Sequence, residues 1–560
     1  MPVSPPSPSY SSTPSYSSTP TFVASPGYSA APNLLFDVYD VAHNVVDSSG
    51  NLSCGFFQEV ILAPGTTSAD DRVLWPPYSN SQPEATGSVP PDPSGQWSTL
   101  LIYNPNLPFK TASSYIGADL KALLSPGVTD GQSYAGGFGG GFPDSTHSFA
   151  YLRPGKAWNP SANGGLGAEY SNSIAVQIDL SKIASDPLNT GGLTYATFDV
   201  KTIGSLGVPA NPPPHTGGFM GCYDPVHGDI YFCGTQDYTT GNPHGVTLKC
   251  HVGTSNQRAN FLNVANWEWL DLHVFATSAG FGGSKRTAQG FQTAIAGPDG
   301  KIYFLPFGLG DSLLCVFDPA GPATAVNRND TTGFGDSKMQ ALGNWSFFDT
   351  STLGPTTQPG GPRAYTGGTV IANRYILMVP WKDNSLTNPA TGRFDDWQEN
   401  LLWAATLYDT VTGLTSSSFS VFDLIKVSNG LGQIAAGYED CWVDKNGVVY
   451  FIPTGVYANS GHTCLPVPIW MPDYSNVAGG SVVASFLDPT RWAAIQDPNL
   501  DFTNGGATGT ALIPASCGGA YDATRDVAYI SSVAPSGAFP VDHTHPWLSR
   551  GVVTRIRRAP

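Results

Sequence analysis

The sequence predicts an all-β fold, a seven-bladed β-propeller with four antiparallel strands in each blade. Three observations predict it: a short apolar phrase recurs along the chain, four strand-like segments accompany each copy, and no long stretch has helical periodicity. A repeat of near-constant length is typical of architectures in which each unit stacks on its neighbours to bury its apolar faces. Closing such units into a ring leaves only short sheet edges exposed.

The recurring phrase contains an aromatic residue that marks each unit. The spacings between successive marker residues are 76, 80, 72, 72, 75 and 79 residues. A β-sandwich array has no reason to keep one period, and a β-helix needs a much shorter one. The seven markers therefore predict seven units in one closed domain, and they are Trp75, Tyr151, Tyr231, Tyr303, Tyr375, Tyr450 and Tyr529.

Each marker lies in the second of the four predicted strands. A glycine-rich apolar run precedes it, and a tight turn joins the two segments, as in a β-hairpin. The third strand is an apolar run such as 174–180, and the fourth ends with an aromatic residue or leucine before aspartate. In the sixth unit we expect the third strand at 481–488 and a weaker fourth strand at 492–497. Repeated aspartates after these strands, such as Asp179, are expected to cap turns.

The two ends of the repeat array are predicted to meet. The seventh unit has candidate strands near 512–521, 526–531 and 550–556, but no fourth strand follows them. A separate apolar run at 34–40 carries Phe-Asp-Val, which matches the fourth-strand pattern at 198–200. We expect this N-terminal strand to complete the last blade and so to close the ring.

Composition limits the function classes. The formal net charge is −16 and only 12% of residues are charged, so non-specific nucleic-acid binding is disfavoured. No apolar run is long enough for a membrane-spanning helix. Residues 1–30 form a low-complexity Pro/Ser/Thr arm without the features of a secretory signal, and residues 31–560 form the propeller.

The eight cysteines show no CxxC spacing, which disfavours a zinc ribbon or a thioredoxin-like site. Cys222, Cys233 and Cys250 fall on three consecutive strands of one unit, so some of them are candidate neighbours. Buried thiols are the favoured interpretation. Disulfides remain an alternative at this point.

Long connections between second and third strands predict a binding face. They lie at about 78–97, 154–171, 382–400, 454–479 and 532–548, whereas the first-to-second connections are tight. Exposed aromatic residues in such loops suit sugar rings or protein partners, although packing of the loops onto the blades is an alternative. The candidate binding residues are Trp158, Trp381, Asp395, Asp396, Trp397, Trp470, Tyr474 and Trp547.

Metal and catalytic sites have weaker signals. Asp542, His543 and His545 form the best candidate metal site, since carboxylate and imidazole can share a cation. Asp395 and Asp396 are candidate paired carboxylates for glycoside cleavage. The oxygen-rich stretch 327–333 is a further candidate for a structural divalent cation. No cofactor is expected, no catalytic residue is assigned, and a non-enzymatic role is favoured.

The sequence resembles β-propeller repeat proteins over residues 34–556, without the GH and WD marks of WD40 blades or a repeated sialidase-type Asp box. Its few Lys and Glu residues, its abundance of Gly, Ser, Thr, Asn and aromatic residues, and its N-terminal arm resemble bacteriophage and other viral structural proteins. This resemblance implies a virion surface protein, such as a tail or tail-fibre component. The arm would dock it to other virion proteins, and it would recognise a host-surface glycan as receptor.

Two other function classes stay open. One is a secreted or cell-surface enzyme, a hydrolase or lyase that acts on polysaccharide. It would need two carboxylates, or a histidine with a metal, at the mouth of the central channel. The other is a purely structural scaffold subunit. The expected location is the virion, with the extracellular space or cell surface as the alternative.

Overall fold

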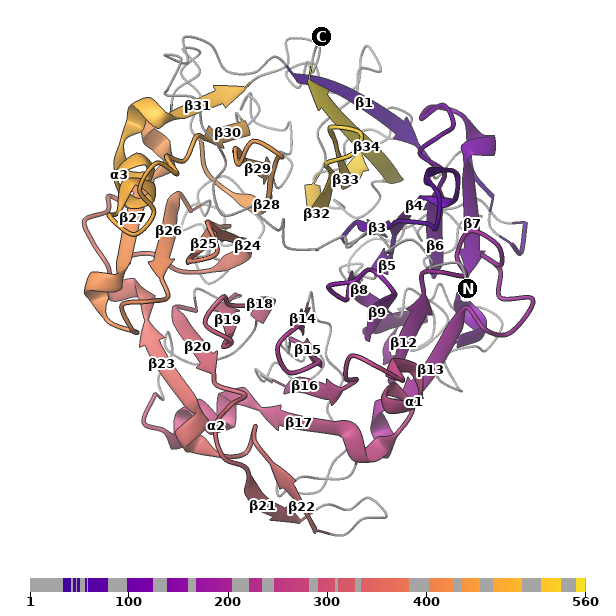
Figure 1. The fold of residues 1–560 in the computed structure, drawn as a ribbon, viewed down its shortest axis with the longest axis horizontal. Helices are drawn as coiled ribbons and strands as arrows, with labels where there is room; N and C mark the ends of the chain where they lie inside the picture. The colour runs from indigo at the N-terminus through magenta and orange to yellow at the C-terminus, as the bar shows by residue number, and fades with distance from the viewer. Residues whose placement is uncertain are drawn as a thin grey trace, which may run out of the picture.

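Seven four-stranded antiparallel sheets are arranged around a central axis, so the predicted seven-bladed propeller is confirmed (Figure 1). The structure is a computed structural model. It describes residues 34–41, 44–46, 48–50, 56–57, 59–78, 98–123, 138–159, 168–203, 221–233, 246–281, 291–307, 311–327, 334–381, 402–427, 435–453, 467–495, 515–534 and 550–558. Residues 1–30, the expected arm, lie outside these ranges.

The first three blades follow one another along the chain, each with an inner, second, third and outer strand. Blade 1 consists of β3 (Ile61–Ala63), β4 (Arg72–Trp75), β6 (Thr99–Tyr103) and β7 (Tyr115–Asp119). Blade 2 consists of β8 (Phe138–Pro143), β9 (Phe149–Pro154), β12 (Ile174–Asp179) and β13 (Tyr195–Asp199). Blade 3 consists of β14 (Gly221–Asp224), β15 (Asp229–Phe232), β16 (Val246–His251) and β17 (Trp267–Asp271).

The next three blades repeat the same strand order. Blade 4 consists of β18 (Phe291–Ala296), β19 (Ile302–Pro306), β20 (Leu313–Phe317) and β23 (Trp345–Asp349). Blade 5 consists of β24 (Tyr365–Ile371), β25 (Tyr375–Pro380), β26 (Ala404–Asp409) and β27 (Phe419–Asp423). Blade 6 consists of β28 (Tyr438–Val443), β29 (Val449–Pro453), β30 (Val467–Trp470) and β31 (Trp492–Ile495).

Blade 7 closes the ring. Its inner three strands are β32 (Ala515–Asp522), β33 (Val527–Ala534) and β34 (Arg550–Arg558), and its outer strand is β1 (Leu34–Asp40). The antiparallel register runs from Leu34 opposite Arg558 to Asp40 opposite Val552. Asp37 accepts hydrogen bonds from Arg555 at 2.6 Å and from Arg557 at 3.1 Å. The predicted closure by the N-terminal strand is therefore confirmed, and Figure 1 shows β1 beside β34.

Shorter elements decorate the blades. Strands β5 (Pro77–Tyr78) and β2 (Phe56–Phe57) extend the blade 2 sheet beyond its inner strand. Two-stranded ribbons are formed by β10 (Lys156–Asn159) with β11 (Ala168–Ser171), and by β21 (Thr324–Asn327) with β22 (Phe334–Ser337). The helices are α1 (Gln257–Phe261), α2 (Leu272–Ser278) and α3 (Ser481–Leu487).

One predicted strand is wrong. The apolar run expected as the third strand of the sixth unit forms α3, and the third strand is β30, which lies earlier in the chain. Val482, Ser485 and Phe486 are the buried residues of α3, at the spacing of one helical face. A run of this length is compatible with a strand or a helix, so its periodicity alone could not decide between them.

The marker residues are buried between neighbouring blades, and none is more than 2% exposed. Each of the six tyrosines packs against the next blade around the ring. For example, Tyr231 lies against Phe304 and Phe317 of blade 4. Trp75 faces the other way, because its indole N–H donates to the Ile530 carbonyl of blade 7. The repeat thus reflects the need of each sheet to fill the gap to its neighbour.

The cysteines that the structure describes are unpaired thiols. The buried-thiol interpretation is confirmed for Cys233, Cys250, Cys315 and Cys441, whereas Cys222 is half-buried. Cys250 faces blade 2, whereas Cys222 and Cys233 face blade 4. Within the same described part of the chain, no helix has the length and apolarity needed to cross a membrane.

Candidate functional site

The propeller has two faces that differ in their connections. The first-to-second and third-to-fourth strand connections lie on one side, which we call the hairpin face. The second-to-third and blade-to-blade connections lie on the other side, the long-loop face. A pocket of about 740 Å³ opens on the hairpin face between blades 2 and 3. Its volume falls in the range of small-molecule binding sites.

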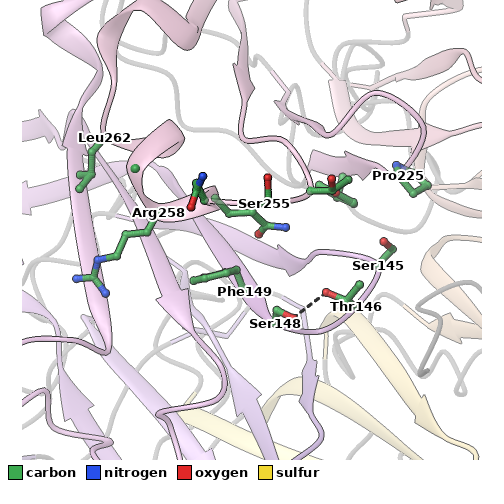
Figure 2. A pocket seen from close by; sticks show the side chains of 13 residues that line it. Ser145, Thr146, Ser148, Phe149, Pro225, Ser255, Arg258 and Leu262 are labelled. Carbon is green, nitrogen blue, oxygen red and sulfur yellow. Dashed lines mark hydrogen bonds between the residues drawn. The ribbon is translucent and has the colours of Figure 1, made fainter. Parts of the chain in front are cut away.

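Three segments build this pocket, which Figure 2 shows from close by. They are the β8–β9 turn with the start of β9, the β14–β15 turn, and the connection from β16 through α1. Most of the polar lining consists of uncharged side chains with hydroxyl or amide groups. The lining residues are Ser145, Thr146, Ser148, Phe149, Tyr223, Pro225, Thr254, Ser255, Asn256, Gln257, Arg258, Ala259 and Leu262.

Two aromatic residues give the pocket an apolar part. Phe149 is partly buried and packs against the core between blades 2 and 3, and Tyr223 is 9% exposed in the same core. Burial raises the pKa of Tyr223 to about 12, with the charges of Asp144 and Asp224 adding to the effect. The phenol is therefore neutral at physiological pH. Aromatic surface beside neutral polar groups is typical of sugar-binding sites.

A buried aspartate organises the β8–β9 turn. Asp144 accepts hydrogen bonds through Oδ1 from the Thr146 and Ser148 amides, at 3.1 and 2.9 Å, and from the Thr146 hydroxyl at 3.0 Å. The Thr146 and Ser148 hydroxyl oxygens are 2.8 Å apart (Figure 2). Burial raises the pKa of Asp144, although hydrogen bonds from Ser148, Thr146 and Gln257 oppose the rise.

A polar chain behind the pocket joins α1 to blade 2. Gln257 accepts a hydrogen bond from the Tyr151 hydroxyl at 3.0 Å, and Tyr151 accepts one from Gln177 at 3.4 Å. All three side chains are at least nine-tenths buried. These buried hydrogen bonds hold Gln257 against blade 2, so this wall of the pocket is preorganised.

Among the described residues that line the pocket, Arg258 is the one with a full charge. Its guanidinium donates to the Leu193 carbonyl and, at 2.9 Å, to the Tyr195 carbonyl. In Figure 2 this group points away from Phe149 and the serines. Arg258 therefore ties α1 to the outer edge of blade 2, and its charge is not directed at the hydroxyl groups.

The hairpin face also carries exposed apolar side chains. Of the large apolar residues that are exposed in the described part of the chain, most lie in first-to-second or third-to-fourth connections. They are Leu107, Leu188, Leu193, Val226, Leu262, Leu342, Val411 and Leu487. Three of them, Leu193, Val226 and Leu262, belong to the connections that surround the pocket. Apolar area around a pocket is typical of contact surfaces.

A second cluster lies on the inner strands near the long-loop face. Glu59 precedes β3, has a left-handed backbone with φ of 69°, and has no hydrogen-bond partner at Oε1 among the described residues. Asp440 lies near the start of β28 and accepts a hydrogen bond from the Gly368 amide at 3.2 Å. Burial, and then the charge of Asp440, raise the pKa of Glu59 well above its usual value. Burial raises the pKa of Asp440 to about 7.

Glycines make room for these two carboxyl groups. A Cβ atom on Gly518 of β32 would lie 2.5 Å from Oε1 of Glu59, and one on Gly367 of β24 would lie 2.3 Å from Oδ1 of Asp440. The inner strands β8, β18, β24, β28 and β32 all shift register near their starts, as β-bulges do. Such bulges change the direction in which side chains point at the rims of closed sheets. Because the charge of Asp440 acts on Glu59, we call these two residues the carboxyl pair.

The structure describes the side chains of three predicted site residues, Trp381, Trp470 and Tyr474; the last two belong to one apolar cluster, which does not include Trp381. Trp381 is 8% exposed and packs on Phe307 at the long-loop face. Trp470 is fully buried at the end of β30, against Phe486 and Trp492. The prediction that these two tryptophans are exposed in loops is therefore wrong. The error for Trp470 follows from reading α3 as the third strand.

Tyr474 follows β30, so it lies on the hairpin face and not on the predicted long-loop face. Its hydroxyl donates to the Gly447 carbonyl at 2.7 Å, which fixes the ring against the β28–β29 turn. Trp158 lies on β10, of which the backbone is described. The other predicted site residues lie outside the described residues: Asp395, Asp396, Trp397, Asp542, His543, His545 and Trp547. The candidate cation stretch also falls largely outside, at 328–333.

Sequence reasoning missed the pocket because its parts are far apart in the chain. The β8–β9 turn belongs to blade 2, whereas the β14–β15 turn and α1 belong to blade 3, and each of the two turns looks like an ordinary tight turn. The available signal was the density of short hydroxyl and amide residues at 145–148 and 254–257. Within the described residues, no three His, Cys, Asp or Glu side chains are arranged to hold a metal ion.

Comparisons with known proteins add no family. No family model matches the chain, and no curated protein matches it. The chain is similar to a virginiamycin B lyase from Staphylococcus aureus, at 8% identity and a TM-score of 0.39, over 94% of this chain and 100% of the other. It is also similar to the RRP9 WD40 repeats, at 9% identity and a TM-score of 0.39, over 93% and 100%.

A third similar structure is from Trichoderma reesei Carbohydrate-Active Enzymes Family AA12, at 10% identity and a TM-score of 0.34, over 95% of this chain and 97% of the other. Such distant likenesses carry no argument about function. The fold assignment rests on the strand order and closure of the chain itself.

Proposed function

We propose that the protein is a carbohydrate-recognition module whose glycan site is the pocket between blades 2 and 3. The observation that carries the proposal is the combination of hydroxyl and amide side chains with two aromatic residues in one preorganised pocket. Sugars offer polar groups at their edges and apolar C–H surface on their ring faces, so both kinds of lining are used.

The setting of this module is proposed from composition. Residues 1–30 would tether it to other proteins of a virion, as in a tail or tail-fibre protein, and the pocket would bind a receptor glycan on the host surface. The deletion of residues 1–30 should then abolish incorporation into particles while the purified protein still binds glycan. Incorporation without residues 1–30 would contradict this role of the arm.

A pocket-filling variant tests glycan recognition. Ser255 is exposed and lines the pocket, so Ser255→Trp fills it without changing the core. The matched control is Ser417→Trp, an exposed serine in the third-to-fourth connection of blade 5. On an array of host-envelope oligosaccharides, we expect Ser255→Trp to weaken binding at least about tenfold, a loss of about 1.4 kcal/mol, with Ser417→Trp unchanged. The absence of any bound glycan, or equal binding by Ser255→Trp, would overturn the proposal.

The carboxyl pair favours a second candidate function, a polysaccharide hydrolase or lyase. Two carboxyl groups whose environments perturb their pKa values are typical of acid–base sites, and Glu59 also has a left-handed backbone. Incubation with capsule or exopolysaccharide should then release new reducing ends, and Glu59→Gln and Asp440→Asn should each abolish the release. If no substrate yields reducing ends, or if both variants remain active, this candidate fails.

A further inference from the structure

The hydroxyl groups at the centre of the pocket have a fixed direction of hydrogen bonding. Oδ1 of Asp144 accepts hydrogen bonds from the Thr146 and Ser148 amides, so this oxygen acts as an acceptor. Thr146 therefore donates its one hydroxyl hydrogen to Asp144 at 3.0 Å. The hydrogen that joins Thr146 and Ser148, whose oxygens are 2.8 Å apart, must then come from Ser148.

Because the hydrogen bonds run in this direction, the Thr146 and Ser148 hydroxyl groups present hydrogen-bond acceptors to the pocket. Both hydroxyl hydrogens are used inside the chain from Ser148 to Thr146 to Asp144, and both residues are exposed. What they offer to a ligand is oxygen lone pairs. A ligand hydroxyl or amine can donate to these oxygens, whereas a ligand carboxylate would face them with no hydrogen between.

The charges near Thr146 and Ser148 also favour an uncharged ligand over an anionic one. Asp144 is fully buried, and its Oδ2 atom has no hydrogen-bond partner of good geometry among the described residues. The guanidinium of Arg258 is held by the Leu193 and Tyr195 carbonyls at the edge of the pocket. An anionic group bound over Thr146 and Ser148 would lose its water shell beside a buried carboxyl group, and no described lining residue directs a cation at it to compensate.

We propose that the pocket selects sugars that donate hydrogen bonds through uncharged hydroxyl or amine groups, and that it rejects carboxylated sugars. This inference rests on the proposed glycan-binding function and adds the chemical class of the ligand. Asp144 is a positioning residue, because it acts on the ligand through Thr146 and Ser148.

The test compares sugars that differ only in charge. Suitable pairs are trigalacturonate, sialyllactose and a hyaluronan tetrasaccharide, each beside its methyl ester, titrated by calorimetry at pH 7. The ester of a pair should bind at least about tenfold more tightly than the acid, which corresponds to about 1.4 kcal/mol. Asp144→Asn keeps an acceptor for the Thr146 and Ser148 amides and adds an amide donor that can reverse the hydroxyl chain. In this variant we expect the ratio to fall to about twofold or less.

The control variant is Asp318→Asn, since Asp318 caps a turn in blade 4 by accepting from the Ala320 amide at 2.9 Å. Its ester-to-acid ratio should match that of the wild type. Acids that bind as tightly as their esters, through binding that Ser255→Trp removes, would overturn the inference and leave the proposed function standing. If neither acids nor esters bind, the proposed function fails and the inference fails with it.

Discussion

At the scale of single residues, aspartates take two different roles in this propeller. The turn caps predicted from their repetition are confirmed for Asp179, Asp318 and Asp409, each of which accepts a hydrogen bond from the amide two residues later. Asp423, predicted as a fourth cap, does not cap its own turn and instead accepts from the Thr357 amide. The two residues of the carboxyl pair, by contrast, do not recur from blade to blade. Glu59 and Asp440 belong to no repeated motif, so no pattern in the sequence marked them.

The carboxyl pair should make stability depend on pH. The folded pKa of Asp440 is about 7 and that of Glu59 is also raised, so their contribution to stability is present in acid and is lost as the pH rises toward neutral. Asp440→Asn removes this loss, and we expect it to stabilise the protein on the order of 2 kcal/mol at pH 8, with little effect at pH 4. Urea denaturation at both values measures the difference. An equal effect of Asp440→Asn at pH 4 and pH 8 would contradict the assignment.

The described cysteines should resist modification in the native protein. Burial raises the pKa of Cys233 to about 12 and raises those of Cys222, Cys250, Cys315 and Cys441 above the usual range for a thiol. The thiolate is the reactive form, so little of it exists at pH 8. Peptide-level mass spectrometry after iodoacetamide treatment should find these five unmodified until urea is added. Native labelling of Cys250 at its unfolded rate would refute this expectation.

At the scale of elements, one side-chain hydrogen bond recurs at the start of the outer strands, and it was not predicted. Trp267, Trp345 and Trp492 begin the outer strands of blades 3, 4 and 6, and each indole N–H donates to the carbonyl six residues earlier. Tyr115 does the same in blade 1 through its hydroxyl group. A short 3₁₀ turn lies between donor and acceptor in each case. The ring anchors the connection and fills the space between blades at once.

Removing one such anchor should cost measurable stability. Trp345→Phe keeps the aromatic contact with Phe317 but leaves the buried Met339 carbonyl without its 2.8 Å hydrogen bond. We expect a loss of about 1–3 kcal/mol in the free energy of unfolding. The matched control is Trp403→Phe, because Trp403 donates at 3.2 Å to Thr357 in an exposed position and water can replace that bond. Equal losses in the two variants would show that burial of the acceptor is not the cause.

Strands and helices were predictable where residues close together in the sequence determine them. Second strands were found because Tyr231 and its counterparts must fill the gap between sheets, and this requirement repeats in every blade. The prediction for the third strand of blade 6 was wrong because three buried residues, Val482, Ser485 and Phe486, are too few to distinguish a helical face from a strand. The carboxyl pair and the pocket could not be found locally, since Glu59 meets Gly518, and Ser148 shares its pocket with Ser255. Those contacts exist only after the ring is closed.

At the scale of the whole molecule, closure by β1 determines stability. Deletion of residues 1–40 removes β1 with its Asp37 bonds and exposes the edge of β34, whereas deletion of residues 1–30 leaves β1 in place. We expect the longer deletion to cost on the order of 3–5 kcal/mol, because Leu34 and Tyr39 lose their packing. Thermal melts and light scattering should show a lower melting temperature and association of the opened edges.

A synthetic peptide sharpens this test. A peptide of residues 31–42 added to the protein that lacks residues 1–40 should restore the melting temperature, since an extended segment can add to a free edge. A peptide with Asp37→Ala should restore less, because Arg555 and Arg557 then have no carboxylate to meet. If the longer deletion melts like the shorter one, β1 does not carry the closure.

The pairing of β1 with β34 also has a consequence for synthesis on the ribosome. Leu34–Asp40 is translated before the described strands of blades 1 to 6, and its partner Arg550–Arg558 is translated after them. At about 5–20 residues per second, translation of the residues between the two strands takes roughly half a minute to two minutes. Throughout that time the segment Leu34–Asp40 lacks its partner strand, which makes the nascent chain a natural client for chaperones.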